Sequence, residues 1–128
     1  MKRSSCEIFL RPETNELRFL PEGPYATPDG RLSWVAIQHG AEAQFGSLNL
    51  FAPSSGVSQS ITMPGRPGFA FPTNVPGVFI CGVEHSLGLI DTATGDWTEF
   101  ATDIDSAVSN TIINDGMIYD GNLIFGCK

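Results

Sequence analysis

The chain has 128 residues, of which 41% are hydrophobic and 16% are charged, and its formal net charge is −7. Its seven basic residues are scattered, which argues against binding to nucleic acid because phosphate recognition needs grouped Lys and Arg. The three cysteines are odd in number and lack metal-binding spacing, so we expect reduced thiols and a cytosolic setting. No stretch is long and apolar enough for a signal peptide or a membrane span, so a soluble cytoplasmic protein with no membrane partner is predicted.

The apolar residues follow a pattern typical of strands rather than helices. No window of about eleven residues keeps apolar positions at helical spacing without an interrupting Gly or Pro. Gly and Pro occur 14 and 9 times, and both residues mark tight turns. The chain is therefore predicted to be all-β.

One pattern occurs three times along the chain: a turn ending in Gly, followed by an apolar strand. We expect these strands over residues 32–37, 78–83 and 123–127. The turn glycines are Gly30, Gly77 and Gly121. They recur at intervals of roughly 45 residues, which is the length of one four-stranded blade of a β-propeller.

A second series supports the same repeat. Residues 46–56 and residues 87–95 both run from a strand into a hairpin turn closed by Gly. A β-sandwich with similar hairpins is the alternative fold, but sandwiches seldom repeat at this spacing. We therefore predict a partial propeller of antiparallel, four-stranded blades.

The number of repeats is too small for a closed ring. The sequence holds about two and a half repeats, whereas propellers close with roughly four to eight blades. Lys128 follows the last strand without a turn or polar tail, and such an open strand edge invites pairing with other chains. We expect residues 1–128 to form a single incomplete propeller domain that is truncated at its C-terminus.

Two stretches resemble the SMP-30/gluconolactonase/regucalcin family. Residues 18–24, RFLPEGP, and residues 29–35, DGRLSWV, are similar to the opening of that family. Residues 114–126, NDGMIYDGNLIFG, are similar to its NDG segment and the strand that follows it. The resemblance runs from about Arg18 to Cys127 and implies the first part of a six-bladed, metal-dependent lactone hydrolase.

The resemblance also implies roles for two residues. Glu22 falls on the family's metal-ligating glutamate, which would hold a divalent ion such as Ca²⁺, Zn²⁺, Mn²⁺ or Mg²⁺. Asn114 falls on an asparagine that faces the substrate, and Asp115-Gly116 is expected to form the turn that directs it. The other ligands and the catalytic base are expected beyond Lys128, so the chain is predicted to be inactive as it stands.

One departure from the family concerns the substrate. Many members that act on sugar lactones carry an arginine two residues before the asparagine, and Ile112 occupies that position here. This difference argues against a strongly polar, gluconate-like lactone and favours a less polar lactone or ester.

Other candidate residues have weaker signals. His39 and His85 have no second ligand at metal-binding spacing, so structural or surface roles are expected for both. Ser54-Ser55-Gly56 lacks the strand–turn–helix setting of a serine nucleophile. Two alternatives to a lactonase remain open: a non-catalytic calcium-binding or regulatory propeller, and a short chain that self-associates into a ring.

Overall fold

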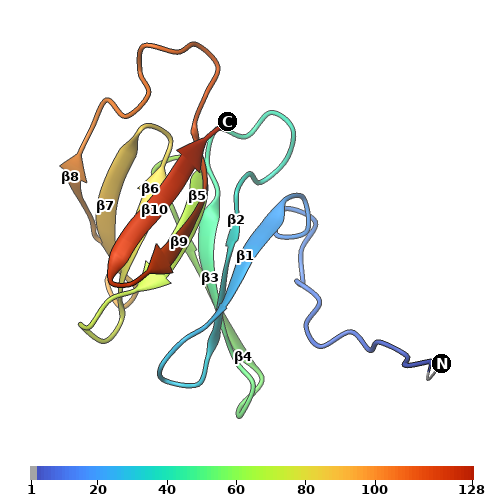
Figure 1. Cartoon of the computed structure of the whole chain (residues 1–128). Helices are drawn as coiled ribbons and strands as arrows, with labels where there is room; N and C mark the ends of the chain where they lie inside the picture. The colour runs from blue at the N-terminus through green and yellow to red at the C-terminus, as the bar shows by residue number, and fades with distance from the viewer. Residues whose placement is uncertain (1–2) are drawn as a thin grey trace.

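The computed structural model describes residues 3–128, and Figure 1 shows the arrangement of the chain. Within these residues the chain forms ten strands. They are β1 (Pro21–Ala26), β2 (Leu32–Ala36), β3 (Ser47–Ala52), β4 (Val57–Thr62), β5 (Pro67–Pro72), β6 (Val78–Val83), β7 (Ser86–Asp91), β8 (Trp97–Ala101), β9 (Ile113–Tyr119) and β10 (Asn122–Cys127). In residues 3–128 there is no helix with the length and apolarity that a bilayer crossing requires.

The strands form three antiparallel sheets in sequence order. Blade 1 has the order β1-β2-β3-β4, blade 2 has the order β5-β6-β7-β8, and blade 3 contains the pair β9 and β10. The sheets are stacked side by side rather than joined into one (Figure 1). This arrangement confirms the predicted all-β partial propeller with two complete blades and part of a third.

The repeat found in the sequence matches the position of each strand within its blade. The three predicted apolar strands are β2, β6 and β10, the second strands of their blades. The glycines before them have positive φ angles in the first hairpin of each blade, namely 82° at Gly30, 79° at Gly77 and 72° at Gly121. The second series corresponds to β3 and β7, each of which runs into the turn before the fourth strand.

Two apolar clusters join the blades. The larger one, between blades 1 and 2, contains fully buried Leu48, Cys81 and Ile90. The smaller one, between blades 2 and 3, is built on Phe69, Phe71 and Ile113. Removing such side chains from water stabilises the fold by roughly 1.5–3 kcal/mol each. Cys81 is a free thiol whose pKa is raised by burial, so it acts as a small apolar residue, as its sequence setting predicts.

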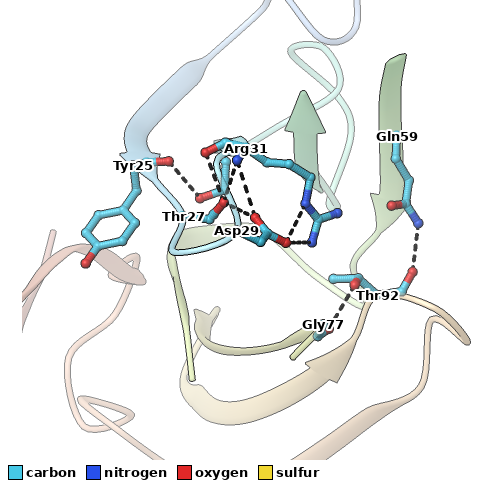
Figure 2. A network of polar contacts seen from close by, with 8 residues as sticks. Tyr25, Thr27, Asp29, Arg31, Gln59, Gly77 and Thr92 are labelled. Carbon is cyan, nitrogen blue, oxygen red and sulfur yellow. Dashed lines mark hydrogen bonds and ion pairs between the residues drawn. The ribbon is translucent and has the colours of Figure 1, made fainter. Parts of the chain in front are cut away.

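A polar network fastens the first hairpin of blade 1, at the end of β1 (Figure 2). The Thr27 hydroxyl donates to Asp29 at 2.5 Å, and the Arg31 Nε donates to the same carboxylate at 2.9 Å. The bond from Arg31, aided by the one from Thr27, lowers the pKa of Asp29 to about 2. These contacts hold the Asp-Gly turn that the sequence repeat identifies.

A second set of bonds in Figure 2 links blade 1 to blade 2. The side-chain amide of Gln59, in β4, donates to the Thr92 carbonyl at 2.7 Å. The Thr92 hydroxyl then donates to the Gly77 carbonyl at 2.8 Å. The two complete blades are therefore joined by polar contacts as well as by the apolar cluster.

Candidate functional site

The candidate site lies where the first strands of the three blades begin. β5 packs between β1 and β9, so the starts of these three strands are neighbours. They surround an open cleft of about 680 Å³. The residues that line it are Leu20, Glu22, Ile37, Gln38, Gln44, Arg66, His85, Asn110, Thr111, Ile112, Asn114 and Lys128. Glu22 and Asn114, which are far apart in the sequence, therefore face the same cleft from blades 1 and 3.

Each first strand is irregular where it borders the cleft. In β1 the register with β2 shifts directly after Glu22, where Gly23 has a φ of 59°. In β5 the shift leaves Gly68 without a partner, and in β9 it leaves Asn114 without one. We call Gly68 and Asn114 the bulge positions, whereas Glu22 keeps Val35 as its partner and borders the bulge of β1. Bulges of this kind redirect side chains away from the regular pleat and are common beside active sites.

The residues just before the three strands are also equivalent. The carbonyls of Leu20, Arg66 and Ile112 each accept a hydrogen bond from the residue after the second strand of the same blade. The donors are the amides of Ile37 at 3.0 Å, Glu84 at 3.1 Å and Lys128 at 2.9 Å. We call Leu20, Arg66 and Ile112 the rim positions. All three line the cleft, so each blade presents one rim position to it.

Asn114 lies in a strand, not in the turn predicted for Asn114-Asp115-Gly116. All three residues belong to β9, and the turn prediction is therefore wrong. The reason is packing between blades: Gly116 lies against the Phe69 ring, where a Cβ would come within 2.8 Å of Cδ1. An Asn-Asp-Gly sequence favours a turn on local grounds, but here the glycine is used for close approach. The bulge, rather than a turn, directs Asn114.

Glu22 is an exposed carboxylate without a cationic partner in the described part of the chain. The ion pairs within residues 3–128 are Arg31–Asp29 and Arg66–Glu84, and neither involves Glu22. A carboxylate oxygen in this state is a suitable donor for a hard divalent cation, and the Asn114 side chain adds an amide oxygen to the same cleft. Within residues 3–128, however, no three His, Cys, Asp or Glu side chains gather to form a complete metal site.

Arg66 and Glu84 form a fixed pair at the blade 2 side of the cleft. The Glu84 carboxylate accepts from the Arg66 amide at 2.9 Å, from Nε at 2.7 Å and from Nη2 at 2.9 Å. Partial burial alone would raise the pKa of Glu84, but these bonds and the positive charge outweigh it and lower the pKa. The same pairing raises the pKa of Arg66. Arg66 is therefore charged and held in one orientation.

The two histidines differ in their surroundings. His85 follows β6 in a tight turn, and its Nδ1 donates to the Ile104 carbonyl at 2.8 Å, which leaves Nε2 as the acceptor of the neutral ring. It also lines the cleft, and the structural or surface role expected for it stays a prediction. His39 instead bonds the Ser47 hydroxyl at 2.8 Å and packs against Phe45. Its contacts agree with the structural role expected for it.

The family described as the SMP-30/Gluconolactonase/LRE-like region matches residues 20–128, which is most of the chain and includes every residue that lines the cleft. No curated protein and no solved structure matches. The family match confirms the resemblance inferred from the Glu22 and Asn114 motifs.

Proposed function

Since the chain belongs to the SMP-30/gluconolactonase/LRE-like family, we propose that it provides the first blades of a propeller that hydrolyses lactones or related cyclic esters with a divalent metal ion. The observation that supports this proposal is the shared cleft. Glu22 and Asn114 come from different blades, Glu22 borders the bulge of β1 while Asn114 lies in that of β9, and both face the same space.

In the proposed reaction these residues have distinct tasks. Glu22 would be one ligand of the divalent ion, whose chemistry is to polarise the lactone carbonyl. The Asn114 side chain, which offers both N–H donors and a carbonyl acceptor, would orient the ring of the substrate by hydrogen bonding. The remaining ligands and the base that activates water would come from residues beyond Lys128, as the family resemblance implies.

The decisive experiment replaces Glu22 with Gln in the complete protein encoded by the gene. Hydrolysis of δ-valerolactone and of D-glucono-δ-lactone would be followed at constant pH by titrating the acid released. We expect Glu22→Gln to lower kcat/KM more than about a hundredfold, because even a residue that only supports a metal ligand can contribute that much. Glu99→Gln, an exposed change in β8, is the matched control and should have no effect.

The outcomes separate the two classes of function. Full activity of Glu22→Gln would overturn the proposed metal-dependent mechanism. Calorimetry with Ca²⁺ on the same protein tests the alternative of a calcium-binding or regulatory propeller. Binding of Ca²⁺ that depends on Glu22, without turnover of either lactone, would favour that alternative over a hydrolase.

A further inference from the structure

The rim positions differ in chemistry although they are equivalent in structure. Leu20 and Ile112 are aliphatic, whereas Arg66 carries a guanidinium group. All three place their carbonyls in the same hydrogen bond of the blade, and all three line the cleft. The rim position of blade 3 is therefore apolar, because it is occupied by Ile112. The equivalent position of blade 2 carries the positively charged side chain of Arg66.

The guanidinium of Arg66 is bound on one side only. Its bonds to Glu84 use Nε–H and one N–H of Nη2, out of the five N–H donors that an arginine side chain carries. The two N–H groups of Nη1 and the second of Nη2 have no hydrogen-bond acceptor among residues 3–128. Because Glu84 already fixes the side chain, little conformational entropy would be lost when these donors bind a ligand.

The surroundings of Arg66 indicate the kind of ligand. A guanidinium can only donate, so the ligand atom that it meets must be an acceptor oxygen. Nearby, the amides of Gln38, Gln44 and Asn114 can both donate and accept, and such groups match hydroxyl groups, which also do both. Glu84 neutralises much of the arginine charge, so recognition depends on several oxygens rather than on a single strong anion.

We propose that Arg66 is a specificity-determining residue that binds oxygens of a polyhydroxylated lactone and of the ring-opened acid, with Glu84 as its positioning residue. This inference rests on the proposed function and names its substrate class. Ile112 taken alone favours a less polar substrate, but Arg66 in the neighbouring blade supplies a guanidinium group to the same cleft.

The test uses the complete protein and two kinds of measurement. Binding of D-gluconate, the ring-opened acid, is titrated by NMR and needs no turnover. KM is measured for D-glucono-δ-lactone and for δ-valerolactone, which has the same ring without hydroxyl groups. The variants are Arg66→Met, Arg66→Lys and the matched control Arg31→Met, which removes an ion-paired arginine at the far end of β1 (Figure 2).

We expect Arg66→Met to raise the Kd of gluconate and the KM of the hydroxylated lactone about tenfold or more, since hydrogen bonds to charged groups are among the stronger ones. The kcat should stay near the wild-type value, because binding lost equally from substrate and transition state changes KM alone. Arg66→Lys keeps the positive charge but lacks the planar guanidinium, so its Kd and KM should lie between those of the wild type and those of Arg66→Met. The KM of δ-valerolactone and all values for Arg31→Met should be unchanged.

Several outcomes would overturn the inference. These are wild-type values in Arg66→Met, an equal loss in Arg31→Met, or no gluconate binding by the wild-type protein. If Arg66→Met does not fold by circular dichroism, Arg66→Lys decides, and an unchanged KM and Kd overturn the inference. Gluconate binding that depends on Arg66 without any turnover supports the inference while the proposed hydrolase fails. Turnover that is independent of Arg66 supports the proposed hydrolase and overturns the inference.

Discussion

Replacing Gly68 with alanine would place a methyl group where blade 2 touches blade 3. A Cβ built at Gly68 would lie 2.5 Å from the carbonyl oxygen of Asn114 and would also overlap the carbonyl oxygen of Ile113. Both obstacles are backbone atoms, so they cannot move aside as a flexible side chain would. Alanine therefore requires β9 to shift relative to β5 by roughly 1 Å before the contact becomes tolerable.

Two effects should follow from that shift. Overpacking of this kind costs about 1–3 kcal/mol of unfolding free energy. With a typical m-value of about 2 kcal/mol per molar urea, the midpoint of denaturation should fall by roughly 1 M. The shift also displaces Asn114, and because a misplacement of about 1 Å can lower a rate a hundredfold, a loss of roughly ten- to a hundredfold in kcat/KM is expected for the proposed hydrolysis.

A matched control is available on the neighbouring strand. Gly126, in β10, has no atom within 4 Å of the position that a Cβ would take. Gly126→Ala should therefore leave stability unchanged or raise it by about 0.4–1 kcal/mol through the unfolded state. Equal urea midpoints for Gly68→Ala and Gly126→Ala, with unchanged amide shifts at Asn114, would refute the argument that Gly68 sets the spacing of the two blades.

Three further predictions concern stability and reactivity. Asp29→Asn should lower the urea midpoint at pH 7, because the bond from Arg31 stabilises the ionised carboxylate of Asp29 in the folded state. The difference in midpoint between the variant and the wild type should vanish as the pH falls from 3.8 toward about 2, where this carboxylate is protonated. Measurement of the midpoint at several pH values tests this, and a difference that persists below pH 2 would contradict it. Cys6 is exposed and should be alkylated at once by iodoacetamide, whereas Cys81 should react only after unfolding, because burial raises the pKa of its thiol. Phe69→Ala should lower the unfolding free energy by about 3–5 kcal/mol in urea denaturation, since the ring fills the junction of blades 2 and 3.

Some elements of the fold were predictable because their signals are local. The second strands β2, β6 and β10 are preceded by turn glycines, and the predicted bounds agree with the observed ones to within one residue. The fourth strands carry no comparable signal. β4 is exposed at five of its six positions, so its sequence VSQSIT lacks the apolar pattern that marks a buried strand. Strands at the outer edge of a blade are identified by their pairing rather than by their composition.

The site was predictable only in part, because family resemblance identifies residues but not their neighbours. Glu22 and Asn114 were found from motifs, and their roles as metal ligand and substrate-binding residue stay predictions. Arg66 and His85 were not singled out as cleft residues, since each lies beside a strand without a recognisable motif. A signal for Arg66 did exist: the interval from Leu20 to Arg66 equals the interval from Arg66 to Ile112. The equal intervals can be interpreted only with the strand register, which shows that Leu20, Arg66 and Ile112 are equivalent positions.

The equivalence of the rim positions leads to a last prediction about the cleft. If any rim position can direct a guanidinium into the cleft, then the double variant Arg66→Met/Ile112→Arg should recover part of the gluconate binding that Arg66→Met loses. Recovery should be incomplete because Lys128 takes the place in blade 3 that Glu84 takes in blade 2, so the relocated arginine has no carboxylate to fix it. We expect the Kd to return to within about tenfold of the wild-type value, measured by the same NMR titration. No recovery in a folded double variant would show that Arg66 acts through its own pairing with Glu84 and not through its place on the rim.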